Sequence, residues 1–593
     1  MRNNTKLSFL GLLGFLGILG NSAFAQNDEL NRSVTVERDF QPEIQAAGKI
    51  ATKPEITETT IEPAEVEYSD YTVSVQPEAT ISPLLSQPTR FEPGQRYNGY
   101  IRGGIGHANT LFDLGYHLND GNKSLLDVFA HHKAQWVEPL LSKTLLGLKY
   151  THNYSTCDLY FGLKGGNIFY HKYGDFYSNS LPNNSTNLWT AEAFIGVKSN
   201  AKQDLQYKVQ TGYKLFTKPN AVSEHQVRTL AKFDWKSDVH YAGANLYVQN
   251  NFIQLSENLA ATIPADSVNS RHAIRLEPYY EYKGTRIRVH VGVNLDMNIG
   301  SRINDGIGTK NFCFAPSPHI NLEAQIAKNW LTFYADIVGN QGMVNLQHYM
   351  EENRYRLIHM GILEPHAGSY TPVDAELGFR IKPYRDLLIE LHGGYAYMKE
   401  QDVWVAVMDS MYFTPLNVKM LAGEFSYYHD TYQRGKVGGQ VNYHYRDFVR
   451  VHLQGDYYIW RGVNTVYDRP NWELSLRVDG KIDEHWSVYS DNYFAGSRMA
   501  KAYSSLTNLY YDAKLDPTIE LNLGVAYNMW VGRAKSNNKR IMMKNGEQIL
   551  RPQSQPNLTL FAQLNNFIHR KNEIYLYHHS SGINCLIGAT FRF

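Results

Sequence analysis

Residue types that could do chemistry are plentiful in this 593-residue chain, but few are spaced as a reactive site requires. Two histidine pairs, His131-His132 and His578-His579, have imidazoles that suit a transition metal. Neighbouring residues on a strand face opposite sides, so neither pair chelates one ion easily. The chain also contains no GxxxxGK[ST] loop, HExxH or GxSxG motif. We therefore expect no enzyme activity, no metal site and no cofactor.

The polar side chains that remain as candidates for a functional site lie on long segments in which apolar and polar residues alternate. Between Arg286 and Asn298 (RIRVHVGVNLDMN), one row of alternate residues is apolar and the other is polar or glycine, and 449–459 and 472–478 alternate similarly. The two rows of a strand lie on opposite faces of a sheet. Strands of soluble sheets usually have about 5–6 residues, whereas a tilted strand needs roughly 9–11 to cross a bilayer. The length favours a membrane barrel, whose apolar row faces lipid and whose polar row encloses water.

We expect the polar rows to face the lumen and to form the functional surface. They could hydrate the interior through cross-strand ion pairs, or they could hold a plug or guide a solute. The candidates are Arg286, Arg288, His290, Asp296, Arg450, His452, Asp456, Glu473, Arg477 and Asp479.

Composition agrees with a secreted barrel. Residues 1–25 combine an early positive charge, an apolar run and the small-x-small end Ala23-Phe24-Ala25, which predicts a signal peptide. The mean hydropathy of −0.42 is too polar for a helical membrane protein, but a barrel exposes only alternate residues to lipid.

A net charge of +1 argues against nucleic acid as a partner. The three cysteines, few and far apart, form no disulfide framework and no metal-spaced cluster.

Residues 26–96 differ from the rest of the mature chain. Between Asn27 and Gln95 they contain 13 acidic and 5 basic residues, a net charge of −8, and seven prolines recur from Pro42 to Pro93. This composition is typical of an extended or partly disordered segment. We expect it to lie in the periplasm.

Residues 97–593 are expected to form an antiparallel transmembrane β-barrel. We count 22 alternating segments, an even number that places both chain ends on one side, the periplasm. Short turns and long loops alternate, as in barrels with periplasmic turns and extracellular loops. The connection 529–555 is an exception, because it is long and basic yet falls on the turn side.

Aromatic residues indicate where the barrel meets its surroundings. Tryptophans recur beside the turns, as in the aromatic belts of barrels: Trp136, Trp189, Trp235, Trp330, Trp460, Trp472, Trp486 and Trp530. The predicted loop 399–434 is rich in aromatic residues. It could contact an outside partner, or it could pack on itself.

The C-terminal stretch from Leu560 to Phe593 resembles the closing hairpin of TonB-dependent outer-membrane receptors. The shared features are Asn565-Asn566-Phe567, the aromatic Tyr575 and Tyr577, and a final strand with Gly582, Asn584, Gly588 and Phe593. The terminal Phe593 also resembles the signal that the bacterial barrel-insertion machinery reads. The resemblance implies a 22-strand barrel in the outer membrane that works in solute transport.

One departure from this family concerns its globular plug. Only 26–96 is available for a plug, so the chain resembles a plug-less relative of the Bacteroidetes type. Ser33–Phe40 bears a faint resemblance to an energy-coupling box, which leaves the engagement of TonB open. The alternative to transport is a structural barrel that scaffolds periplasmic or surface-lipoprotein partners. Because side chains cannot fill so wide a lumen, it must be closed by 26–95, by the loops 339–372 and 399–434, or by a partner.

Overall fold

The computed structural model describes most of residues 98–593. The expected signal peptide and the acidic segment 26–96 lie outside the described residues. Within 98–593, the residues not described are 121–122, 173–184, 201–203, 258–269, 305–308, 329, 343–344, 357–368, 414–417, 447, 463, 532–539, 545–546 and 552–555.

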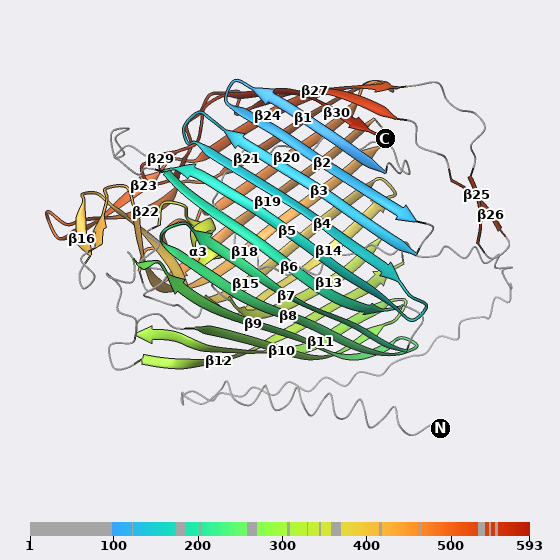
Figure 1. Ribbon diagram of the computed structural model, residues 1–593, viewed down its shortest axis with the longest axis horizontal. Coiled ribbons are helices and arrows are strands. Elements are labelled where there is room, and N and C mark those ends of the chain that lie inside the picture. Colours follow the sequence, from blue (N-terminus) through green and yellow to red (C-terminus); the bar gives the residue numbers. More distant parts are fainter. Residues whose placement is uncertain are drawn as a thin grey trace, which may run out of the picture. The chain divides into compact units, whose positions relative to one another are not determined.

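Twenty-two antiparallel strands close into a barrel (Figure 1). Each strand pairs with the next one in the ring, and the last strand pairs with the first, so the ring has no free edge. The first eleven are β1 (Gly99–Gly106), β2 (Asn109–Asp120), β3 (Ser124–Gln135), β4 (Leu141–Asn153), β5 (Cys157–His171), β6 (Ser185–Ser199), β7 (Leu205–Lys218), β8 (Val222–Ser237), β9 (His240–Leu255), β10 (Arg271–Lys283) and β11 (Ile287–Asn304). The other eleven are β12 (Thr309–Ala327), β13 (Leu331–Gln341), β14 (Tyr370–Tyr384), β15 (Leu387–Val407), β18 (Phe425–Tyr445), β19 (Val449–Gly462), β20 (Trp472–Lys481), β21 (Trp486–Ala495), β24 (Thr518–Trp530), β27 (Asn557–Asn565) and β30 (Asn584–Arg592).

The remaining described elements lie in the connections between ring strands. In the long loops these are α3 (Leu346–Glu352), β16 (Met411–Phe413), β17 (Val418–Met420), β22 (Arg498–Ser504), β23 (Leu509–Leu515), β28 (Glu573–Tyr575) and β29 (His578–His579), and in the connection 531–556 they are β25 (Arg540–Lys544) and β26 (Glu547–Arg551). The hairpin β22–β23 joins the main sheet through a parallel pairing with β15. The described part of the chain contains no helix that is long and apolar enough to cross a membrane.

The predicted fold class is confirmed, and each of the 22 predicted segments overlaps a ring strand. The main difference concerns β15 and β18, which were expected to span only 386–398 and 435–445. Their pairing resumes after an irregularity between Met398 and Gln401 and continues to the pair Ala406–Phe425. Much of the predicted loop 399–434 is therefore a hairpin that extends the barrel wall.

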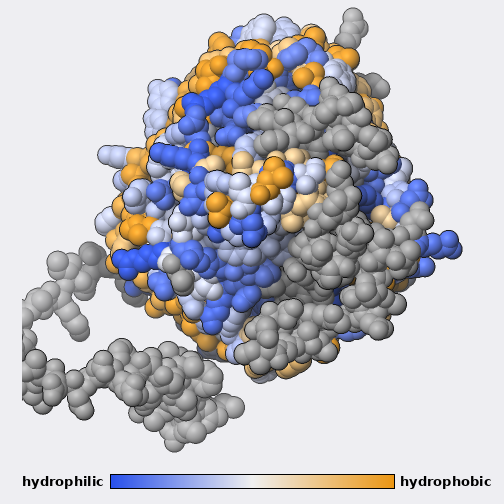
Figure 2. Space-filling model, turned by 90° about the vertical axis from the view of Figure 1, so that its left-hand side faces the viewer, coloured by the Kyte–Doolittle hydropathy of each residue, from blue (hydrophilic) through white to orange (hydrophobic). Residues whose placement is uncertain are grey.

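Large apolar side chains face outward from the wall. In β6, Ile195 has 51% of its surface exposed, whereas the side chain of Glu192 forms ion pairs with Lys164 on β5 and Arg228 on β8. Figure 2 views the loop end of the molecule, and apolar residues gather along parts of its outline. This inverts the arrangement of a soluble sheet and is the pattern of a strand with lipid on one side.

Six of the predicted belt tryptophans are exposed, and they fall at both ends of the strands. Trp136, Trp189 and Trp472 lie at the loop end, and Trp235, Trp330 and Trp486 lie at the turn end. Trp460 is half-buried, and its indole Nε1 donates a 2.9 Å hydrogen bond to the carbonyl of Pro470. The side chain of Trp530 is outside the described residues. Two aromatic rows about one strand length apart match the two interfaces of a bilayer.

Candidate functional site

The residues predicted on the β11 row fall into two kinds of surroundings. Arg286 lies in the turn before β11 and is exposed, and Arg288 has 68% of its side chain exposed. His290 lies 3.3 Å from a carboxylate oxygen of Glu277 on the adjacent β10. Asp296 is buried and accepts a 2.5 Å hydrogen bond from Arg275. The two arginines are therefore at the turn end, apart from the buried polar groups.

The residues predicted on β19 and β20 lie opposite one another. In the register, Arg450 pairs with Asp479, His452 with Arg477, and Asp456 with Glu473. Because residues that pair across strands project from the same face, all six belong to one polar patch.

Ion pairs and hydrogen bonds engage the carboxylates of this patch. Arg477 contacts Asp479 at 3.0 Å and Asp491 at 3.3 Å, while Asp456 accepts a 2.6 Å hydrogen bond from His392. Glu473 accepts hydrogen bonds from the Tyr458 and Tyr493 hydroxyls. The patch supplies a neutralised, hydrogen-bonded wall. Its role in guiding a solute stays a prediction.

The long loops form a second feature, a hydrophobic cluster at the loop end that we call the cap. The cap combines residues of four loops with the loop-end residues of β5 to β8. Its buried members are Tyr170, Leu188, Phe216, Val222, Leu346, Tyr349, Met350, Tyr355, Trp404, Ala406, Val407, Met420, Phe425, Tyr427, Ala500, Ala502, Leu515, Ile574, Tyr575 and Leu576. Thus Trp404, Phe425 and Tyr427 of the predicted loop pack within the protein, the second of the two alternatives for that loop.

An ion pair shows how far the cap reaches. Lys172 follows β5, the fifth strand of the ring, and its ammonium pairs with the buried carboxylate of Glu424, which precedes β18, the sixteenth strand. These strands are eleven positions apart in a ring of 22, which places them on opposite sides. A direct contact between them requires the loops to cross the mouth of the barrel.

Arg356 is the polar centre of the cap. Only 1% of its side chain is exposed, and its guanidinium contacts Asp402 at 2.8 Å and Glu352 at 3.3 Å. It lies 3.5 Å from the ring centroid of Trp404 and 4.0 Å from that of Tyr349. A buried cation needs both charge partners and aromatic faces to offset its lost hydration. Arg356 therefore ties the α3 loop to the extended end of β15.

The short helix α3 is fixed at both ends. Asn345 caps its N-terminus by accepting a 2.7 Å hydrogen bond from the backbone N–H of His348. The buried carboxylate of Glu224, on β8, accepts a hydrogen bond from the backbone N–H of Leu346. At the other end, the Tyr575 hydroxyl donates to the Glu352 carbonyl at 2.8 Å. These contacts hold the helix between the wall and the last loop.

His578 is buried inside the cap rather than being exposed as a pair with His579. Its ring centroid lies 3.8 Å from that of Tyr355, and its Nδ1 lies 2.9 Å from the Leu576 carbonyl. Burial, together with the nearby charges of Arg354 and His579, lowers the pKa of His578 to about 3. The neutral imidazole is therefore part of the packed cluster.

A pocket of about 160 Å³ lies beside the cap, between the loop ends of β3 to β6, α3 and the last loop. Asn565 and Asn584 line the pocket and pair in register across β27 and β30. They are 2% and 1% exposed, and none of their four side-chain amide atoms has a hydrogen-bond partner among the described residues. Because a buried amide without partners is costly, the pocket is suited to a polar guest that supplies them.

Sequence reasoning pointed to some aromatic residues of the cap, namely Tyr575 and those of the loop 399–434, but to none of the charged residues that hold it together. Arg356, Lys172 and Glu424 are ordinary charged residues in the sequence, and only their burial distinguishes them. The one available signal was the density of aromatic residues in 399–434. Asn565 and Asn584 entered through a family resemblance, and the structure adds their burial and their pocket.

Comparisons with known proteins support the fold. No family model matches the chain. No curated protein matches it either. Among solved structures, it is similar to the siderophore receptor PirA from Acinetobacter baumannii, with a TM-score of 0.59, 9% identity, and coverage of 86% of this chain and 81% of that one. The pyoverdine outer membrane receptor FpvA from Pseudomonas aeruginosa PAO1 gives a TM-score of 0.56 at 10% identity, covering 86% and 79%.

The copper transporter OprC is a third structural neighbour, with a TM-score of 0.58, 10% identity, and coverage of 86% of this chain and 84% of that one. Three proteins with different cargoes in their descriptions thus share one barrel with this chain. At such low identity the likeness establishes the fold, and the cargo has to be argued from the chain's own residues.

Proposed function

We propose that this protein is an outer-membrane barrel that moves a small polar solute across the membrane, with the cap as its closure at the outer mouth. The observation that carries the proposal is the buried ion pair between Lys172 and Glu424, which joins opposite sides of the ring. A mouth bridged in this way is shut until the loops separate. The exposed apolar wall and the two tryptophan rows support the membrane location.

We further propose that the pocket lined by Asn565 and Asn584 is the first binding site for the solute. Amides donate and accept hydrogen bonds, so they suit hydroxyl, amide or carboxylate groups rather than an apolar guest. The solved neighbours include receptors described as binding siderophores, and a polar cargo agrees with that chemistry.

The finer assignment is to a receptor of the TonB-dependent type that lacks the usual plug. The closing-hairpin resemblance from Leu560 to Phe593 and the 22-strand ring support it. A cap that bridges the mouth performs one task of a plug, which explains how so wide a barrel can remain closed. The termini and the segment 26–96 are then periplasmic, where that segment could meet partner proteins.

Conductance in planar lipid bilayers tests the closure. Wild-type mature protein should be almost non-conducting, and Lys172→Glu should conduct because it places two carboxylates together in the cap. The double variant Lys172→Glu with Glu424→Lys restores opposite charges and should close again. Equal conductance in all three proteins would show that the cap is not the structure that closes the barrel.

Deleting residues 26–96 in the same assay separates the cap from an N-terminal plug. A current that appears only after this deletion would assign the closure to the N-terminal segment. Absence of current and of solute flux even in the charge-reversed and deleted forms would overturn the transport proposal. Loss of co-purifying proteins on deletion would then favour a scaffold.

A further inference from the structure

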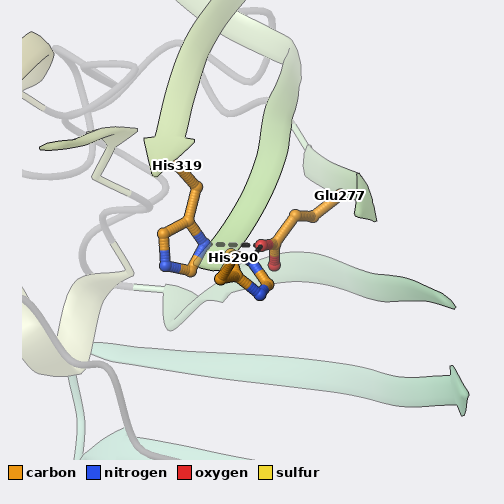
Figure 3. A group of neighbouring side chains, drawn as sticks. All are labelled: Glu277, His290 and His319. Atoms are coloured by element: carbon orange, nitrogen blue, oxygen red, sulfur yellow. Dashed lines mark hydrogen bonds and ion pairs between the residues drawn. The ribbon is translucent and has the colours of Figure 1, made fainter. Parts of the chain in front are cut away.

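Three side chains from three consecutive strands converge on one point of the barrel wall (Figure 3). They are Glu277 on β10, His290 on β11 and His319 on β12. One potential ligand atom from each residue lies within 4.8 Å of the other two. The Nδ1 of His319 lies 2.5 Å from the Oε1 of Glu277, and the Nε2 of His290 lies 3.3 Å from the same oxygen.

The sheet register explains why these side chains meet over Gly292. Gly292 pairs with His319 on one side and with Tyr279 on the other, and it lies two residues from His290 on the same face. A methyl group on Gly292 would lie 3.1 Å from the Oε1 of Glu277. The absence of a side chain at this position leaves the space into which the carboxylate reaches.

We propose that Glu277, His290 and His319 form a binding site for a divalent transition-metal ion such as Zn²⁺. Two imidazoles and one carboxylate are a ligand set that zinc and other late divalent metals accept, with the remaining positions open to water. The inference does not depend on transport, since the three residues can hold an ion in a closed or an open barrel.

The geometry is close to that of a metal site. Bonds of about 2.0–2.1 Å in a tetrahedral site place neighbouring ligand atoms roughly 3.3 Å apart. The His290–Glu277 distance of 3.3 Å already has this value. The His319–Glu277 distance of 2.5 Å is that of a hydrogen bond and must widen by about 1 Å, with the His319 proton moving to the other ring nitrogen.

The surroundings leave the site accessible and support its ligands. The side chains of His290 and His319 are 17% and 30% exposed, so water and an ion can reach them. Asn245 donates a 2.8 Å hydrogen bond to the second oxygen of Glu277 and orients the carboxylate. The nearby Arg275 pairs with Asp296 at 2.5 Å and so does not compete for Glu277.

A second cluster of similar composition provides a comparison. Glu376, Glu390 and His392 also bring their ligand atoms within 4.8 Å of one another. Here Lys436 pairs with Glu376 at 2.9 Å and Arg380 pairs with Glu390 at 3.0 Å, so cations already occupy the carboxylates. A metal ion would have to displace both, and we expect this cluster to bind none.

Titration of the mature wild-type protein in detergent with Zn²⁺, followed calorimetrically, tests the site. One high-affinity ion per chain is expected, and a Co²⁺-loaded sample should show the visible absorption of nitrogen and oxygen ligation. His290→Gln and His319→Gln should each weaken Zn²⁺ binding by roughly 100-fold or more, since even outer partners of metal ligands account for about 10–100-fold. The matched control, His392→Gln, should bind as the wild type does.

Zinc-edge X-ray absorption on the loaded wild-type protein requires no variant, so a folding defect cannot obscure it. Two imidazoles per zinc support the site. A spectrum without two imidazoles would overturn it. So would the absence of stoichiometric binding to wild type, or an affinity unchanged in folded His290→Gln and His319→Gln.

Discussion

The wall and the cap of this protein bury their apolar side chains in opposite directions. In the wall, Ile195 and its outward neighbours are exposed while the carboxylate of Glu192 forms ion pairs on the other face. In the cap, Trp404 and Phe425 are inside, as in the core of a soluble domain. Figure 2 shows hydrophilic residues around a smaller apolar group on the loop end.

The solvent explains the difference. Hydrocarbon touches the wall, so apolar groups gain nothing by turning inward and backbone groups must be satisfied within the ring. Water surrounds the loops, so the cap forms by the hydrophobic effect. The long hairpin of β15 and β18 passes from the hydrocarbon around the wall to the water around the loops within one pair of strands.

Arg356→Ala should give the largest loss of stability, and the loss should be confined to the cap. It leaves Asp402 and Glu352 without their shared cation, and removing one partner of a buried ion pair costs roughly 3–5 kcal/mol. Hydrogen exchange in α3 and in 400–407 should accelerate strongly, while the thermal unfolding of the ring should not change.

The matched control for this variant is Arg354→Ala. Arg354 is a half-buried neighbour whose guanidinium lies 5.4 Å from the ring centroid of Tyr355. It should change exchange in α3 much less. Equal acceleration in both variants would contradict the role given to Arg356.

Ile195→Arg should break the wall and leave the cap intact. The residue lies six positions from Trp189, toward the centre of the lipid-facing band, where an arginine costs roughly 2–4 kcal/mol. Refolding into lipid vesicles over a urea series measures the loss. Trp189→Arg, at the interface, should cost roughly 0–1 kcal/mol, and a reversed order would argue against lipid contact.

The pH dependence of the loop end sharpens the comparison, because His578 in the cap and the half-buried Asp468 in the connection 463–471 act with opposite signs. Burial lowers the pKa of His578 to about 3 from 6.5, so the closed cap binds fewer protons than the open one and loses stability as pH falls below 6.5. Burial raises the pKa of Asp468 to about 6 from 3.8, so its contribution is present below 3.8 and is lost as pH rises through 6.

Two variants separate these contributions. Between pH 6.5 and 4.5, His578→Gln should stabilise the cap increasingly as the pH falls, because it removes the cost of a buried neutral imidazole that would otherwise be protonated. Asp468→Asn should stabilise the cap most at pH 6.5 and progressively less as the pH falls, because it removes the cost of the ionised carboxylate. Each contribution changes by up to roughly 1.4 kcal/mol per pH unit. Burial also raises the pKa of Glu352, which acts in the same direction as Asp468. Hydrogen exchange of 573–579 at several pH values gives the measurement, and parallel profiles in the two variants would contradict the assignment.

Asn345→Ala should give the smallest effect. It removes the side-chain hydrogen bond that caps α3, which is typically worth about 1 kcal/mol. Exchange should increase within α3 only, and Asn345→Asp should preserve it. An effect on the ring would show that the cap and the wall are coupled.

The alternation of residues along the chain determined the wall, the strand count and the outward face. A wall strand is recognised by the alternation of apolar and polar residues with a period of two and by its length. Both are local properties of the sequence, as β11 and β20 show. The same pattern placed Asp456 and Glu473 on polar rows, and the structure pairs them across β19 and β20.

The tertiary structure alone decided the cap, the pocket and the triad of Glu277, His290 and His319. These depend on contacts between residues far apart in sequence, such as Lys172 with Glu424, and no local period encodes such contacts. The aromatic residues of 399–434 could be counted in the sequence, but whether they face water or one another depends on loops from opposite sides of the ring. Closure of the ring creates that proximity, which is the physical reason that the sequence pattern could not reveal it.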